Sequence, residues 1–151
     1  HRNIAEAQWC RYLQLKLRFP VIALPNFEAA IRDSKMLFVV AAGNGNQYQV
    51  GYDIDKFSVY PASLPYDNVI TVGNLLFNGR LDDSSNYGAV SVDLAAPGTY
   101  ILSTIPGDSY AYMSGTSMVS PMVTGAAALI YSARTDFKPS GHKNSYFINC
   151  T

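Results

Sequence analysis

The chain has 151 residues, of which 48% are hydrophobic and 15% are charged, and its formal net charge is zero. This length is enough for one domain with a sizeable core, and the composition excludes a disordered chain. A neutral chain without a long basic cluster also argues against a nucleic-acid-binding protein. Two cysteines, Cys10 and Cys150, lie near opposite ends and could pair, but two cysteines identify no cellular compartment.

The N-terminal segment, residues 1–26, matches no motif and is left unassigned. Trp9, Leu13 and Leu17 follow one another at four-residue spacing, which predicts a helix within residues 4–17. The chain opens with mixed polar residues and not with an apolar stretch, so it has no feature of a secretory signal peptide.

A helix over residues 26–35 and a strand over residues 36–42 are predicted next. Asn26 is a favourable N-cap, and residues 36–42 (MLFVVAA) form an apolar run of strand length. A helix followed by a fully apolar strand indicates a parallel α/β sheet with helices on its faces. A second strand is predicted over residues 68–73 (NVITVG).

The apolar strand stops at Gly43-Asn44-Gly45-Asn46. By itself this pattern is most typical of a turn, because Gly and Asn both tolerate positive φ angles. The alternative interpretation is functional, since Asn44 follows the C-terminal end of a strand, where parallel sheets carry their active sites. An amide donor at that edge could stabilise an oxyanion.

Residues 47–57 are polar and predict a surface loop. Asp53 and Asp55 could supply alternating oxygen ligands to a cation. Two carboxylates without further ligands are weak support, so a solvated loop is the preferred interpretation and no metal or cofactor is predicted.

Turn residues divide the following part of the chain into short strands. Asn78-Gly79 predicts a hairpin, and Pro97-Gly98 predicts a type II turn. Further short strands are predicted over residues 90–96, 101–105 and 110–113.

Residues 112–131 (YMSGTSMVSPMVTGAAALIY) contain no charged side chain. Gly115 permits a tight turn, and a helix is predicted over residues 118–131 with Pro121 in its first turn. A helix that is apolar or small on every side is expected to be buried. It is shorter than the roughly 20 residues of a membrane span. Ser117, where the loop enters this helix, is either an N-cap or a nucleophile that a nearby base would activate.

Three stretches together resemble the subtilisin-like serine peptidases (subtilases). The resemblance covers residues 27–131 and leaves residues 132–151 as a polar tail. It implies an α/β, three-layer fold with a mainly parallel sheet and a buried central helix, of which the N-terminal strands are missing, so that an apolar edge is exposed. The stretches are Gly115-Thr116-Ser117-Met118, then Ser120-Pro121 with Gly125-Ala126-Ala127-Ala128-Leu129, and Ala41-Ala42-Gly43-Asn44.

The resemblance implies a serine endopeptidase that hydrolyses peptide bonds of peptide or protein substrates through a Ser117 acyl-enzyme. It assigns the oxyanion contact to Asn44. Secretion and calcium binding are also typical of the family, but the chain shows no signal peptide and no convincing calcium site. The residues that the resemblance assigns to substrate binding are Ala41, Ala42, Gly43 and Thr116.

The aspartate and histidine motifs that precede the serine in this family do not occur before Ser117. Asp136 and His142 follow it, in a polar tail without predicted strands to hold a base. We therefore expect the chain alone to be inactive or nearly so. Two alternatives stay open: a peptide-binding pseudo-protease without turnover, and one half of a domain that another polypeptide completes.

Overall fold

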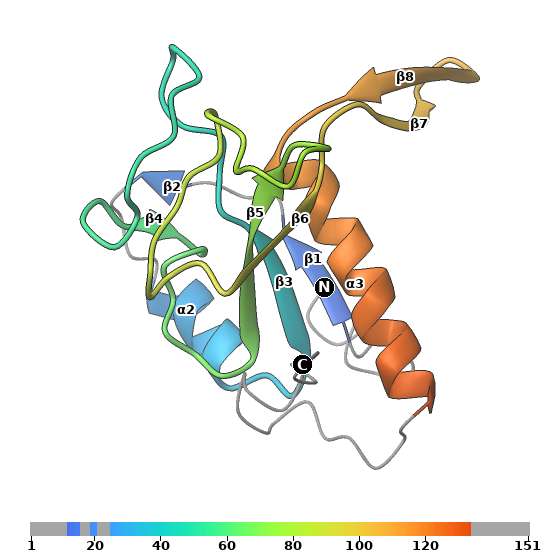
Figure 1. Cartoon of the computed structure of the whole chain (residues 1–151). Helices are drawn as coiled ribbons and strands as arrows, with labels where there is room; N and C mark the ends of the chain where they lie inside the picture. The colour runs from blue at the N-terminus through green and yellow to red at the C-terminus, as the bar shows by residue number, and fades with distance from the viewer. Residues whose placement is uncertain (1–11, 16–18, 21–24, 134–151) are drawn as a thin grey trace.

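The computed structural model describes residues 12–15, 19–20 and 25–133 (Figure 1). Its centre is a four-stranded parallel sheet in the order β1-β3-β5-β6. Helix α2 lies on one face of the sheet and helix α3 on the other, which confirms the predicted α/β fold with three layers. The elements of these layers are β1 (Tyr12–Leu15), α2 (Pro25–Arg32), β3 (Leu37–Ala41), β5 (Val69–Leu75), β6 (Leu94–Pro97) and α3 (Thr116–Ala133).

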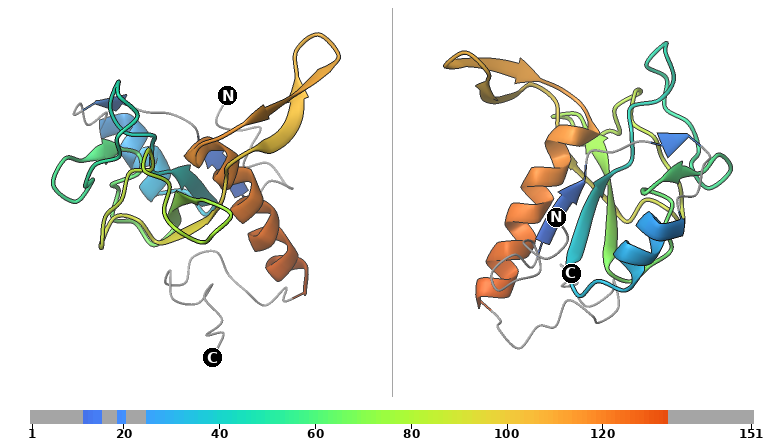
Figure 2. Two further views of the ribbon diagram at one scale, coloured as in Figure 1. Left: turned by 45° about the horizontal axis from the view of Figure 1, so that its top comes forward. Right: turned by 180° about the vertical axis from the view of Figure 1, so that it is seen from behind.

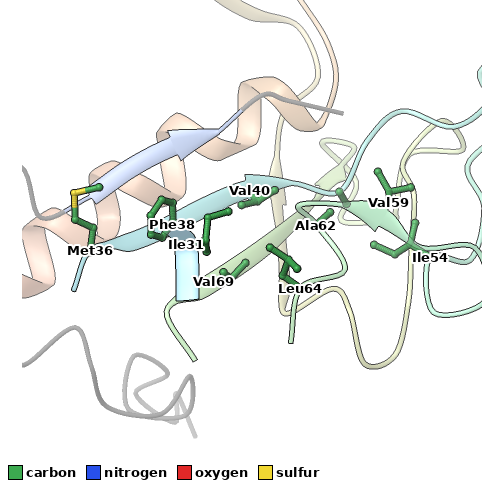
Figure 3. Packing of buried hydrophobic residues seen from close by; sticks show 10 residues of the cluster. Ile31, Met36, Phe38, Val40, Ile54, Val59, Ala62, Leu64 and Val69 are labelled. Atoms are coloured by element: carbon green, nitrogen blue, oxygen red, sulfur yellow. The ribbon is translucent and has the colours of Figure 1, made fainter. Parts of the chain in front are cut away.

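Strand β3 is buried on both faces, because its side chains alternate between two cores. Phe38 and Val40 face the core beneath α2, which Figure 3 shows from close by. Leu37 and Val39 face the opposite core, where Val119 of α3 packs. The continuous apolar run in the sequence thus reflects a strand between two helical layers.

The described part of residues 4–17 is a strand, so the helix predicted there is wrong for these residues. Tyr12–Leu15 form β1, which pairs in parallel with β3 from Tyr12 opposite Leu37 to Leu15 opposite Val40. Pairing with a segment far along the chain thus overrides the local four-residue spacing. The strand β1 also occupies the edge of β3 that was expected to be exposed. The rest of residues 4–17 lies outside the described residues.

Most of the other predicted elements are confirmed within a few residues. The helix expected over residues 26–35 spans Pro25–Arg32, so Asn26 lies inside it and is not its N-cap. An antiparallel bridge between Leu75 and Leu81 closes the hairpin predicted at Asn78-Gly79. The remaining strands form two small antiparallel pairs, β2 (Phe19–Pro20) with β4 (Val59–Tyr60) and β7 (Ile101–Ile105) with β8 (Ser109–Met113).

The type II turn predicted at Pro97-Gly98 is wrong. Pro97 ends β6, and Gly98 does not have the positive φ that this turn requires. A Cβ atom on Gly98 would lie 2.4 Å from Val119 Cγ2 and 2.6 Å from Asn74 Oδ1. Glycine is therefore required here because the chain passes very close to the start of α3.

Helix α3 differs from the prediction at its start and on its outer face. It begins at Thr116, so Pro121 lies beyond the first turn and cannot supply the N–H that would bind the carbonyl of Ser117. One side of α3 packs against β1, β3, β5 and β6, but Leu129 on the other side is 72% exposed and Met122 is 40% exposed. The prediction of all-round burial is wrong because the sheet covers only one side of the helix (Figure 2).

The hairpin of β7 and β8 projects from the body beside the start of α3 (Figures 1 and 2). Large apolar and aromatic side chains along it are exposed, including Leu102, Tyr110 and Tyr112. In the part of the chain that the structure describes, no helix combines the length and the apolar character that crossing a membrane requires.

Candidate active site

Two segments far apart in the sequence meet where β3 ends and α3 begins. The Thr116 backbone N–H and the Thr116 hydroxyl both donate to Asn44 Oδ1, each at 2.9 Å. The Gly43 backbone N–H in turn donates to the Thr116 hydroxyl oxygen at 3.2 Å. These bonds join positions about 70 residues apart in the chain, and they bring the predicted oxyanion residue to the start of the predicted nucleophile helix.

The bonds from Thr116 fix the direction of the Asn44 amide. Because the NH₂ group of asparagine donates and does not accept, the atom that accepts from Thr116 must be Oδ1, and Nδ2 is left to face elsewhere as a donor. Gly115 passes directly beside this nitrogen: a Cβ atom there would lie 2.7 Å from Asn44 Nδ2. With a φ of +136°, Gly115 also adopts a backbone conformation that favours glycine. Asn44 as a residue is exposed to solvent.

Ser117 lies in the first turn of α3, directly after Thr116, and is half-buried. N–H groups in the first turn of a helix have no carbonyl of the same helix to bind. The Ser117 backbone N–H and Asn44 Nδ2 are therefore two donors near the start of α3. The helix dipole adds a partial positive charge at the same end.

The described part of the chain supplies no base for Ser117. It contains no histidine, and it shows no hydrogen bond from the Ser117 hydroxyl to another described residue. Asp136 and His142 lie outside the described residues. The described residues at this position thus supply a hydroxyl and N–H donors but no histidine that could activate the serine.

The predicted substrate-binding residues lie around these donors. Ala41 and Gly43 are half-buried, whereas Ala42 and Thr116 are fully buried. The Ala42 side chain belongs to the core beneath α2, and the Thr116 hydroxyl is occupied by its bonds to Asn44 and Gly43. What this strand end can offer a substrate is therefore mainly its backbone and the half-buried positions.

Asp53 and Asp55 are engaged in bonds that hold the predicted surface loop. The Asp55 carboxylate accepts hydrogen bonds from the backbone N–H groups of Val90 at 3.0 Å and Ser91 at 2.8 Å. Hydrogen bonds from the Ser91 side chain and from the Val90 backbone hold the pKa of Asp55 below its ordinary value. Asp53 forms an ion pair with Lys56 at 3.0 Å.

A metal site finds no further support in these residues. Nowhere in residues 25–133, or in the short strands before them that the structure describes, do three or more His, Cys, Asp or Glu side chains gather as metal ligands would. Calcium binding stays a prediction of the family resemblance alone.

Sequence reasoning missed Asn86, which is fully buried beneath the loop that carries Asn44. Its side chain donates to the Ala42 carbonyl at 2.8 Å and accepts from the Gly45 backbone N–H at 3.0 Å. In the sequence, Asn86 is one of several polar residues in the stretch DDSSNYG, and no local pattern distinguishes it from its neighbours.

Comparison with known proteins agrees with this geometry. Residues 20–146 match the Subtilase family. The chain belongs to this family. Among related subtilases, a thermophilic serine proteinase of Bacillus sp. strain AK1 is 50% identical over 94 residues, which are 62% of this chain and 21% of that protein. The major intracellular serine protease of Bacillus subtilis is 38% identical over 112 residues, which are 72% of this chain and 33% of that protein.

Solved structures of proteases share the fold of this subtilase chain. A protease from Pseudoalteromonas arctica superposes with a TM-score of 0.73 at 30% identity, covering 88% of this chain and 42% of that one. A prenylagaramide maturation protease superposes with a TM-score of 0.74 at 28% identity, covering 92% of this chain and 50% of that one. The subtilase chain thus spans no more than half the length of these relatives.

The names of related subtilases give different compartments. An extracellular basic protease of Dichelobacter nodosus is 45% identical over 104 residues, which are 64% of this chain and 16% of that protein. The relative from Bacillus subtilis is named as intracellular. Membership of the subtilase family therefore does not by itself assign this chain to a compartment.

Proposed function

We propose that the chain is the C-terminal part of the catalytic domain of a serine endopeptidase, with peptides or proteins as substrates. Membership of the subtilase family supports this proposal. The observation that carries it is the double hydrogen bond from Thr116 to Asn44 Oδ1, which leaves the Asn44 amide nitrogen as a donor next to Gly115, two residues before Ser117.

In the proposed reaction, Ser117 Oγ attacks the carbonyl carbon of the scissile peptide bond, and the carbonyl oxygen gains negative charge. Asn44 Nδ2 and the Ser117 backbone N–H donate hydrogen bonds to this oxygen. Donors that are already in place stabilise the transition state efficiently, because they do not have to reorganise during the reaction. A base that the described residues do not supply must take the proton of the Ser117 hydroxyl and give it to the leaving amine; the tetrahedral intermediate then expels the amine and leaves an acyl-enzyme on Ser117, which water hydrolyses.

The substrate would lie along the end of β3. Since the side chains of Ala42 and Thr116 are buried, we assign the contacts of the residue before the scissile bond to Ala41, Gly43 and the backbone between them. Ala42 and Thr116 then act by shaping this edge and not by side-chain contact with the substrate.

We also propose that the isolated chain turns over slowly. A serine hydroxyl without a base is a weak nucleophile, and the family's aspartate and histidine motifs do not precede Ser117. In a subtilisin, the oxyanion site and substrate binding alone retain about 10³–10⁴ over the uncatalysed rate. A rate of that order is the upper limit that we expect for this chain by itself.

The second candidate is one half of a domain that another polypeptide completes. It is favoured by the outer face of α3, where Met122 and Leu129 are exposed although the helix contains no charged residue. In this arrangement the complementing polypeptide would supply the aspartate and the histidine.

Labelling with an activated phosphonate probe tests both candidates. We expect slow labelling of the isolated chain and faster labelling after it is mixed with a polypeptide that carries the family's aspartate and histidine motifs. Ser117→Ala should abolish labelling, and Asn44→Ala should lower turnover of the completed domain about 10²–10³-fold, the loss measured for one oxyanion donor in a subtilisin. Rapid labelling of the isolated chain would contradict its proposed inactivity. Tight peptide binding without labelling in either sample would instead indicate a pseudo-protease.

A further inference from the structure

Asn86 binds the loop that follows β3 through every polar atom of its side chain. Its Nδ2 donates to the carbonyl of Ala42 at 2.8 Å, and its Oδ1 accepts from the backbone N–H groups of Gly45 at 3.0 Å and Tyr52 at 3.3 Å. Its own backbone N–H donates to the carbonyl of Gly43 at 2.9 Å. Asn86 therefore binds the backbone of the loop at Ala42, Gly43 and Gly45.

These bonds enclose Asn44 on both sides. Ala42 and Gly43 precede it and Gly45 follows it. The bonds from Asn86 therefore hold the backbone on both sides of Asn44, in addition to the bond between Thr116 and the Asn44 side chain. We propose that Asn86 is a positioning residue of the oxyanion site, which acts on the reaction only through Asn44. The inference rests on the proposed function, since it assumes that Asn44 donates to the oxyanion.

The chemistry of the contact requires an amide. One end of the Asn86 side chain must donate to a carbonyl while the other accepts from N–H groups, and an amide of this length offers both at every pH, whereas a carboxyl group of the same length does so only when it is protonated. The packing is equally restrictive, because a Cβ atom on Gly43 would lie 2.7 Å from Asn86 Nδ2, and Gly43 has a φ of +98°. A misplacement of about 1 Å at a reacting group can cost about 10²-fold in rate, so such restraint matters for catalysis.

Asn68 provides a matched control at the opposite end of β3. Its Nδ2 donates to the backbone carbonyls of Ile31 at 2.8 Å, Ser34 at 3.2 Å and Met36 at 3.3 Å. Asn68 thus ties backbone segments together in the same manner as Asn86 but touches no residue of the candidate site. A loss of stability shared by both variants can therefore be separated from an effect on Asn44.

The first experiment follows the Asn44 side-chain amide protons by NMR in the isotope-labelled chain, with Asn44→Ala to assign the signal. We expect Asn86→Ala to move this signal toward that of an unrestrained asparagine, and Asn68→Ala to lower stability while leaving the signal in place. An unchanged Asn44 signal in folded Asn86→Ala would overturn the proposal.

Asn86→Asp adds a pH-dependent readout, which also serves if Asn86→Ala does not fold. When protonated, the new carboxyl group can donate to the Ala42 carbonyl and accept from Gly45, as the amide does. When ionised, it has no donor and faces the Ala42 carbonyl with negative charge. We expect the native Asn44 signal at acidic pH and its loss as the pH rises through the pKa of this carboxyl group. The absence of this titration at Asn44 would contradict the proposal.

The second experiment measures turnover of the chain completed by its complementing polypeptide. Asn86→Ala should lower kcat about 10–10²-fold with little change in KM, because it displaces a group that acts in the transition state. It should have no additional effect in the Asn44→Ala background, since it acts only through Asn44. An additive loss in the double variant would overturn the positioning role. A lack of effect of Asn44→Ala would instead show that the proposed oxyanion function itself fails.

Discussion

The two faces of the central sheet are covered to different extents. On one face, α2 buries Ile31 and exposes the neighbouring Arg32, and loop residues such as Ile54 and Leu64 complete the core. On the other face, α3 has no charged side chain in its sequence, yet Leu129 is exposed to solvent. The composition of a helix and its actual burial are therefore separate properties. The outer side of α2 carries a charged residue, Arg32, as expected for a surface that faces solvent. The outer side of α3 is apolar and is not covered by any described residue.

The largest expected effect contrasts the two helices directly. Ile31→Ala should lower the free energy of unfolding by about 2–5 kcal/mol, because it leaves a cavity in the closed core. Leu129→Ala makes a similar truncation on the open face, at a side chain that is 72% exposed, and should change stability by less than about 0.5 kcal/mol. Urea denaturation measures both values. Similar losses in the two variants would contradict the contrast between the faces.

The next effect concerns the inner side of α3. Gly98→Ala should destabilise the chain by about 1–3 kcal/mol, because the new Cβ atom would lie 2.4 Å from Val119 Cγ2 and 2.9 Å from the carbonyl oxygen of Gly115. The same clash would displace the start of α3, so the hydrogen bond from Thr116 to Asn44 should weaken. Urea denaturation together with amide exchange at Thr116 tests this, and native protection of Thr116 would argue against it.

A smaller effect of opposite sign is expected on the outer side of the same helix. Gly125→Ala should stabilise the chain by up to about 1 kcal/mol, because alanine favours the helix and a Cβ atom there has no neighbour within 4 Å. The thermal midpoint is a suitable measurement. Destabilisation would instead show that another segment packs against Gly125 and covers the outer side of α3 in solution.

The smallest expected effect is the pH dependence of stability that Asp55 contributes through its hydrogen bonds to Val90 and Ser91. Because the pKa of Asp55 is lowered in the folded chain, its contribution is present above the unfolded-state pKa and is lost as the pH falls through the folded-state pKa. Asp55→Asn should therefore lose less stability between neutral pH and about pH 3 than the parent chain does. Urea midpoints at the two pH values give the comparison, with the exposed Asp83→Asn as control. An equal acid response in parent and Asp55→Asn would refute the assignment.

Sequence reasoning succeeded where short-range chemistry determines the structure. The uninterrupted apolar runs identify β3 and β5, and the Asn78-Gly79 pair identifies a hairpin. The resemblance to the subtilases also implied that Asn44 and Ser117 belong to one site, and in the structure Asn44 does contact the start of α3.

Sequence reasoning failed where contacts between residues far apart in the sequence determine the structure. Leu13 lies in a spacing that suits a helix, but pairing with β3 makes it part of a strand. Gly98 follows a proline as turn residues do, yet its role is to allow close packing against Val119. Asn86 could not be identified because its importance lies entirely in the backbone groups that surround it in space.

The hydrogen bond between Thr116 and Asn44 can form only late in the synthesis of the chain. It connects positions 72 residues apart, and α3 is the last of the described elements to be made. On the ribosome, β3 and β5 can emerge and pair while Thr116 is still untranslated or inside the exit tunnel. The Asn44 amide therefore acquires its fixed direction only near the end of translation of the described residues, and a nascent chain that stops before Thr116 lacks the hydrogen bonds that orient it.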